Sequence, residues 1–166
     1  MARVAIVTGG TRGIGHAISV ALKQAGYKVA ANYAGNDAAA QKFQDETGIP
    51  TYKWDVGDYE ACATGLSKVA SDLGPVDVVV NNAGITKDAM LHRMSPQAWS
   101  EVIRVNLNSM FNMSQPVLET VGYELQGTGL YSTPAVNLPV LFGSAVLSSA
   151  ALLWCTRPAR TEVGRG

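Results

Sequence analysis

The chain has 166 residues, which is the size of one ordinary domain and excludes a two-domain enzyme. Apolar residues make up 47% of it and charged residues 16%, so the chain is neither disordered nor collagen-like. Thirteen basic residues balance thirteen acidic ones, so we expect neither nucleic acid nor an anionic membrane surface as a partner.

Cysteine usage and the N-terminus bear on the cellular compartment. Cys62 and Cys155 are the two cysteines, and their spacing matches no metal or redox motif. This fits a reducing compartment and predicts no metal site. The first ten residues carry an apolar run that is too short for a signal peptide, so we expect a cytoplasmic protein.

Short β-branched runs and amphipathic segments alternate over residues 1–116. The apolar runs predict four strands, at Arg3–Thr8, Tyr27–Asn32, Thr51–Asp55 and Val76–Asn81. The segments that follow them predict four helices, at Ile14–Ala25, Asp37–Glu46, Asp58–Leu73 and from Ser95-Pro96 through Phe111. Because strand–helix units in series favour right-handed crossovers, the sequence predicts an α/β fold with a doubly wound, Rossmann-like parallel sheet.

A glycine-rich loop joins the first predicted strand to the first predicted helix, with the sequence Thr8-Gly9-Gly10-Thr11-Arg12-Gly13-Ile14-Gly15. One glycine permits a tight turn, another lets the backbone approach a pyrophosphate, and Gly15 lets helix and strand pack closely. The N-terminus of the helix offers free N–H groups and a positive dipole to phosphate. A plain connector can carry the same glycines, but the position between strand and helix favours dinucleotide binding.

Four motifs in chain order resemble those of the short-chain dehydrogenase/reductase family. They are the spacing Gly9…Gly13…Gly15, Asp55-Val56, Asn81-Asn82-Ala83-Gly84, and Asn106 within Val-Asn-Leu. The resemblance covers residues 1–116, which correspond to the N-terminal half of the family's fold. The loop sequences are most similar to those of bacterial acetoacetyl-CoA reductases, with 3-oxoacyl-acyl-carrier-protein reductases as near neighbours. The resemblance implies NADPH-dependent reduction of acetoacetyl-CoA or a related small-molecule 3-oxoacyl thioester.

The resemblance also implies a dinucleotide site at the carboxyl ends of the strands. Its residues are expected to be Gly9, Thr11, Arg12, Gly13, Ile14, Gly15, Asn32, Tyr33, Asp55, Val56, Asn82, Ala83 and Gly84. A carboxylate at the end of the second strand is typical of NAD-dependent enzymes, but that end reads Ala-Asn-Tyr-Ala. Since the Arg12 guanidinium can meet a 2′-phosphate, we predict NADP as the cofactor, with a solvated loop arginine as the alternative.

The catalytic residues of the family are incomplete in this chain. Asn106 matches its catalytic asparagine, and Asp88 matches a substrate-side aspartate or is a solvated loop acid. The family's proton donor is a tyrosine with a lysine four residues later, but neither Tyr123 nor Tyr131 has such a lysine, and no lysine occurs after Lys87. We therefore predict a truncated and inactive copy of such a reductase. The alternatives are a non-catalytic NADP-binding module and a fragment of a 3-oxoacyl-acyl-carrier-protein reductase.

The composition changes near Pro116, and residues 117–166 show no strand–helix alternation. We expect an incomplete dinucleotide-binding domain in residues 1–116, followed by an apolar tail that is irregular or misfolded. Leu138–Trp154 is uncharged and near the lower length limit of a membrane span, but its proline and serines argue against a membrane anchor. The favoured interpretation is a tail translated from another frame or spliced from elsewhere.

The shortened fold has consequences for solubility and assembly. Without a further strand beside it, Val76–Val80 would be an exposed apolar edge, which favours aggregation. Members of the family form homo-oligomers, and the sequence leaves the oligomeric state of this chain open.

Overall fold

The computed structural model describes residues 2–127 and 152–155 of the chain. Its sheet contains the parallel strands β1 (Val4–Val7), β2 (Lys28–Tyr33), β3 (Thr51–Lys53) and β4 (Val76–Asn81). The strand order is β3-β2-β1-β4-β5, where β5 is Leu152–Cys155. The chain moves outward from β1 to β3 and then crosses to β4 on the other side of β1. This confirms the predicted doubly wound α/β fold, in which the strand order reverses beside β1. Ligands of such folds bind at this switch point.

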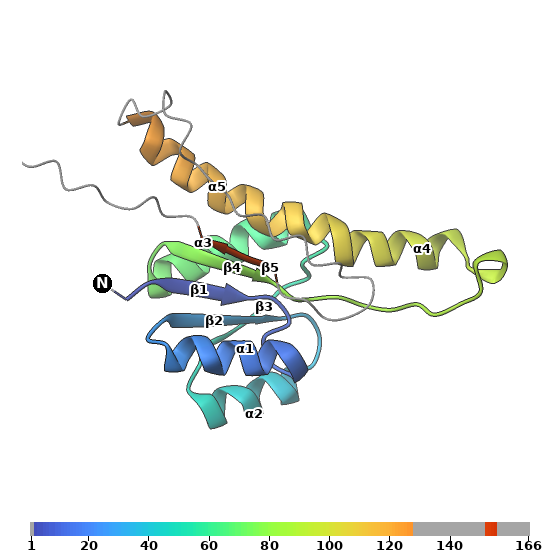
Figure 1. Cartoon of the computed structure of the whole chain (residues 1–166), viewed down its shortest axis with the longest axis horizontal. Coiled ribbons are helices and arrows are strands. Elements are labelled where there is room, and N and C mark those ends of the chain that lie inside the picture. Colours follow the sequence, from blue (N-terminus) through green and yellow to red (C-terminus); the bar gives the residue numbers. More distant parts are fainter. Residues whose placement is uncertain (1, 128–151, 156–166) are drawn as a thin grey trace, which may run out of the picture.

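Helices cover both faces of the sheet (Figure 1). One face carries α1 (Gly13–Gln24) and α2 (Asp37–Thr47), and the other carries α3 (Tyr59–Leu73) and α5 (Ser109–Gly127), which pack together. Before α5 lie a 3-10 turn (Leu91–Arg93), α4 (Pro96–Ile103) and a π-helical turn, η2 (Arg104–Asn108). The first three predicted helices are confirmed to within a few residues. The last predicted helix begins as expected, but it is divided by the π-helical turn and continues past Phe111 to Gly127.

The strands are buried on both faces, as near-continuous apolar runs predict. Ile6 and Val79 face a core cluster that includes Met113 of α5, while Val7 and Val80 face a second cluster on the side of α1 and α2. All four strand residues are fully buried. The carboxyl ends of β1 and β4 are therefore held rigidly side by side, which fixes the starting points of the loops that leave them.

Side-chain caps fix where three of the helices begin. Asn36, Asp58 and Ser95 each accept a hydrogen bond from the backbone N–H three residues on, at 2.9, 3.1 and 3.1 Å. A cap of this kind contributes about 1 kcal/mol to helix stability. The starts predicted at Asp58 and Ser95 are confirmed, and α1 is different because its N-cap residue, Arg12, makes no side-chain cap.

The predicted open edge at Val76–Val80 is wrong. β5 pairs antiparallel with β4, with Val79 opposite Trp154 and Asn81 opposite Leu152. Because an unpaired edge strand exposes a row of N–H and C=O groups, pairing with β5 satisfies groups that would otherwise recruit another chain. The covering strand comes from the tail, where the sequence predicts no regular structure.

The composition change near Pro116 falls inside a helix, because α5 runs through Pro116 to Gly127. Residues 138–151 of the candidate membrane segment lie outside the described residues, and so does Tyr131. Among the helices that the structure describes, none is both long and apolar enough to cross a membrane.

Candidate nucleotide-binding site

The loop between β1 and α1 brings backbone N–H groups to the carboxyl edge of the sheet. Gly15 lies so close to the start of this loop that a Cβ atom there would overlap the carbonyl oxygen of Gly9. α1 begins at Gly13 without a side-chain cap from Arg12, and its first turn holds no acidic residue. The N–H groups that a helix leaves unpaired at its start are therefore available to an anion. This arrangement fits the pyrophosphate of a dinucleotide.

Thr8 ties the Asn82-Ala83-Gly84 segment after β4 to the end of β1. The N–H groups of Asn82 and Ala83 both donate to Thr8 Oγ1 at 2.9 Å, and Asn82 Nδ2 donates to the Thr8 carbonyl oxygen at 2.8 Å. Thr8 itself is 2% exposed. Sequence reasoning missed this residue, although a hydroxyl directly before the first glycine was a usable signal.

Asn32 and Tyr33, at the end of β2, differ in what they offer a ligand. Asn32 is 1% exposed, and its Nδ2 donates to the Trp54 carbonyl oxygen at 3.1 Å. The Asn32 carbonyl oxygen also accepts a hydrogen bond from the N–H of Gly10 at 3.0 Å, so this residue joins β2 to β3 and to the glycine loop. Burial and then the neighbouring Asp37 carboxylate raise the pKa of Tyr33, so its hydroxyl stays protonated at neutral pH.

Asp55 and Val56 follow β3 at the same edge of the sheet. Asp55 Oδ1 accepts a hydrogen bond from the N–H of Gly57 at 2.8 Å, and Asp55 Oδ2 lies 2.8 Å from Nη1 of Arg104. The Val56 carbonyl oxygen accepts a hydrogen bond from Nδ2 of Asn112 at 3.0 Å. The roles of Arg104 and Asn112 were missed, because both lie on a helical segment far along the chain and belong to no motif.

Asn106 lies in η2 and holds the loop that follows β4. Its Oδ1 accepts a hydrogen bond from the N–H of Ile85 at 2.8 Å, and its Nδ2 donates to the Ile85 carbonyl oxygen at 2.9 Å. Gly84 lies beside this pair, since a Cβ atom there would come within 3.4 Å of Asn106 Oδ1. The structure therefore brings Asn106 next to the Asn82-Ala83-Gly84 segment.

Asp88, considered for the substrate side, and Tyr123, considered as a proton donor, lie in other parts of the fold. Asp88 is exposed in the long stretch between β4 and the 3-10 turn, which Figure 1 shows running outward from the sheet. Tyr123 lies in α5.

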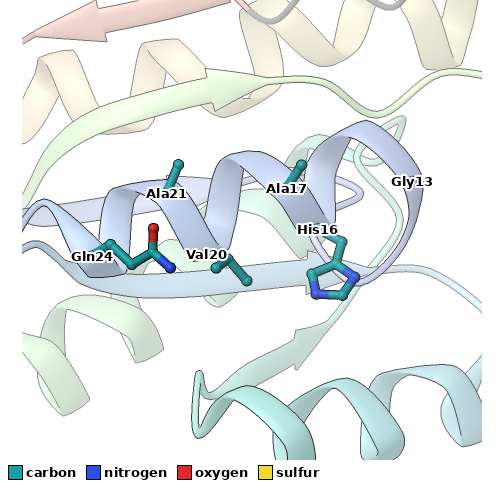
Figure 2. A pocket seen from close by; sticks show the side chains of 6 residues that line it. All are labelled: Gly13, His16, Ala17, Val20, Ala21 and Gln24. Carbon is teal, nitrogen blue, oxygen red and sulfur yellow. The ribbon is translucent and has the colours of Figure 1, made fainter.

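A hollow of about 380 Å³ lies along α1 (Figure 2). Its lining comes from this one helix and consists of Gly13, His16, Ala17, Val20, Ala21 and Gln24. Only Gly13 belongs to the glycine loop. His16 packs edge-on against Phe43 with ring centroids 5.0 Å apart. The hollow brings few polar groups together, so the loops at the carboxyl edge remain the better candidate for a ligand site.

The fold and these loops define a doubly wound α/β domain with a candidate nucleotide site at the carboxyl edge of its sheet. A family model described as short chain dehydrogenase matches residues 3–128, which is most of the chain. The chain belongs to the short-chain dehydrogenase family. The resemblance stated from the four motifs is therefore confirmed.

Individual relatives agree with this membership. The chain is 68% identical over 117 residues to an acetoacetyl-CoA reductase of Shinella zoogloeoides, and 65% identical over the same length to one of Rhizobium meliloti. These matches cover 70% of this chain and 48% of each relative, so the chain spans about half their length. It is also 36% identical to a 3-oxoacyl-acyl-carrier-protein reductase of Staphylococcus epidermidis, over 98% of this chain and 70% of the relative.

Proposed function

We propose that this chain binds NADP(H) across the carboxyl edge of the sheet. The observation that supports this most is the pair of hydrogen bonds from Asn82 to Thr8, which holds the glycine loop and the loop after β4 next to each other. The pyrophosphate would lie at the uncapped start of α1, and the adenine would lie beside Asp55 and Val56. Residues of both loops therefore fit one extended dinucleotide.

The choice of NADP over NAD rests on charge. β2 ends at Tyr33, and Ala34 follows it, so no carboxylate stands where one would bind a ribose 2′-hydroxyl. The nearest acid in the chain, Asp37, is paired with Lys53 at 2.8 Å. Arg12, which is exposed at the start of α1, would supply the positive charge for a 2′-phosphate.

We propose a 3-oxoacyl thioester as the substrate class of the enzyme from which this chain derives. The relatives named acetoacetyl-CoA reductase, at 65% and 68% identity, favour a coenzyme A thioester. The relative that acts on acyl-carrier-protein thioesters is less similar but aligns with 98% of this chain, which makes it the second candidate. When bound, NADPH supplies the hydride for such a reduction.

We further propose that the 166-residue polypeptide binds the cofactor but does not turn it over. Reduction of a ketone needs a proton donor beside the carbonyl oxygen. Asn106 uses both ends of its side-chain amide to hold Ile85, and no lysine follows Lys87 to lower the pKa of a tyrosine. An unassisted tyrosine, with a pKa of about 10, is a poor acid–base group at neutral pH.

Titration with NADPH of the wild-type protein and of Gly15→Val tests the proposed binding. A side chain at Gly15 would overlap the carbonyl oxygen of Gly9 and distort the glycine loop, so we expect the variant to lose NADPH binding. Gly35→Val, at a glycine with open space around it, is the matched control and should bind NADPH normally. The oxidation of NADPH with acetoacetyl-CoA, followed at 340 nm, should stay at the background rate for all three proteins. Equal binding by the wild type and Gly15→Val would overturn the site, and turnover would overturn the proposed inactivity.

A further inference from the structure

Arg104 bridges two carboxylates that belong to different parts of the fold. Its Nη1 lies 2.8 Å from Oδ2 of Asp55, which follows β3. On its other side, Nε and Nη2 donate to the two carboxylate oxygens of Glu101 at 3.0 and 2.9 Å. A guanidinium held by a two-point contact is fixed in orientation, because its donors form a planar fork. Glu101 therefore aims the remaining edge of Arg104 at Asp55.

The turn after β3 is shaped around this guanidinium. A Cβ atom at Gly57 would overlap Nη1 of Arg104, so Arg104 occupies space that a side chain at position 57 would need. The N–H of Gly57 donates in turn to Asp55 Oδ1 at 2.8 Å. The Asp55–Gly57 turn and the arginine therefore determine each other's position.

The helical turn that carries Arg104 also carries Asn106. Both residues lie in η2, and Asn106 holds Ile85 of the loop after β4 through two hydrogen bonds. Further along, Nδ2 of Asn112 donates to the Val56 carbonyl oxygen, and Asn112 is 7% exposed. One helical segment thus fastens the turn after β3 and the loop after β4 to each other.

We propose that Arg104 is a positioning residue of the nucleotide site, which holds the Asp55 carboxylate in the orientation that accepts the amino group of adenine. This inference rests on the proposed NADP(H) binding. A carboxylate offers about four acceptor positions on its two oxygens. Gly57 and Arg104 use one on each oxygen, which leaves one on each for a donor from a ligand. Arg104 acts through Asp55 and does not itself touch the nucleotide.

A solvent-exposed ion pair with no further role is the alternative. Such pairs typically contribute little to stability, and the Arg104 side chain is 35% exposed. The two possibilities differ in what they affect. A positioning role predicts a loss of affinity for the adenine half of the cofactor at an unchanged melting temperature, which a bare surface pair would not cause.

Titration of the full 166-residue protein with 2′,5′-ADP distinguishes a positioning role from a bare surface ion pair. This ligand carries the adenosine half of NADP. We expect Arg104→Met to raise the Kd for 2′,5′-ADP about tenfold, the size typical of a lost charge-assisted contact. Arg104→Lys keeps the charge but not the fork, so it should recover part of the affinity. Lys68→Met removes a comparable ion pair, the 3.1 Å contact with Asp72, and should bind like the wild type.

A double-mutant cycle completes the test. If Arg104 acts through Asp55, Asp55→Asn combined with Arg104→Met should lose no more affinity than the more damaging single variant. Wild-type affinity in Arg104→Met, additive losses, or an equal loss in Lys68→Met would each overturn the inference. Failure of the wild-type protein to bind 2′,5′-ADP would instead overturn the proposed cofactor binding, and the inference with it.

Discussion

Thr8 accepts two hydrogen bonds from Asn82, one on its side chain and one on its backbone. The N–H of Asn82 donates to Thr8 Oγ1 at 2.9 Å, and Asn82 Nδ2 donates to the Thr8 carbonyl oxygen at 2.8 Å. The residues lie 74 positions apart and directly follow two adjacent parallel strands, β1 and β4. This contact fixes the two loops of the candidate site relative to each other before any ligand binds, so the site is preorganised by the sheet.

Replacement of Thr8 by valine should destabilise the fold. Valine keeps the shape of threonine but removes the acceptor for the N–H groups of Asn82 and Ala83, so we expect a loss of about 1 to 3 kcal/mol. Thr8→Ser keeps the hydroxyl and should lose less than half as much. Urea denaturation of both variants measures this difference. Equal stability of the valine and wild-type proteins would show that the hydroxyl does not hold the loops.

Replacement of Arg12 by methionine should change cofactor selectivity. We expect the Kd for NADPH to rise about tenfold, since one charge-assisted contact to the 2′-phosphate is lost. NADH lacks this phosphate, so its affinity should not change. Isothermal titration calorimetry with both nucleotides gives the ratio of the Kd for NADPH to the Kd for NADH. Arg93→Met, in the 3-10 turn, serves as the control. A parallel loss for NADPH and NADH would contradict the role of Arg12.

An acid placed at Asn32 should damage the fold more than it changes the cofactor. Asn32 is buried and donates to the Trp54 carbonyl oxygen, whereas an aspartate there would set a carboxylate against that oxygen. We expect Asn32→Asp to cost about 2 to 4 kcal/mol of unfolding free energy. Asn36→Asp is the matched control, because aspartate caps a helix as well as asparagine does. A stable Asn32→Asp protein that prefers NADH would contradict this assignment.

The Cys62 thiol should be inert at neutral pH and should make stability fall at alkaline pH. Burial raises the pKa of Cys62 from 9.0 to about 12. Because the folded protein binds this proton more tightly, the associated stability is fully present below pH 9 and is lost as pH rises from 9 to 12. Cys62→Ala should show a shallower decline in denaturation experiments over that range. Alkylation resolved by peptide mass spectrometry should leave Cys62 unmodified at pH 8, and rapid labelling there would contradict its burial.

Much of the fold could be predicted from the sequence because its signals are local. The apolar run at Val76–Asn81 coincides with β4, and Asp58 and Ser95 cap the helices that they were expected to begin. The glycine loop could also be located, because only glycine fits at Gly15. In each case, the predicted feature depends on a few residues that lie close together in the sequence.

What sequence reasoning missed depends on distant partners. Nothing local marks Arg104 as the partner of Asp55, and no propensity predicts that Arg104–Asn108 forms a π-helical turn. Asn32 was expected at a ligand, but its amide is used within the sheet. The pairing of β5 with β4 was missed because the tail has no strand signal of its own, and it is the edge of β4 that provides a partner.

Hydrogen–deuterium exchange of the 166-residue protein with and without NADPH tests the central claim most directly. Bound cofactor should slow exchange in three separate segments, at residues 9–15, 55–57 and 82–84, because the proposed cofactor would contact all three. It should leave the outer face of α1 around Val20 unchanged. No change in these segments at saturating NADPH, or slowing confined to the α1 hollow, would contradict the claim that these loops form the nucleotide site.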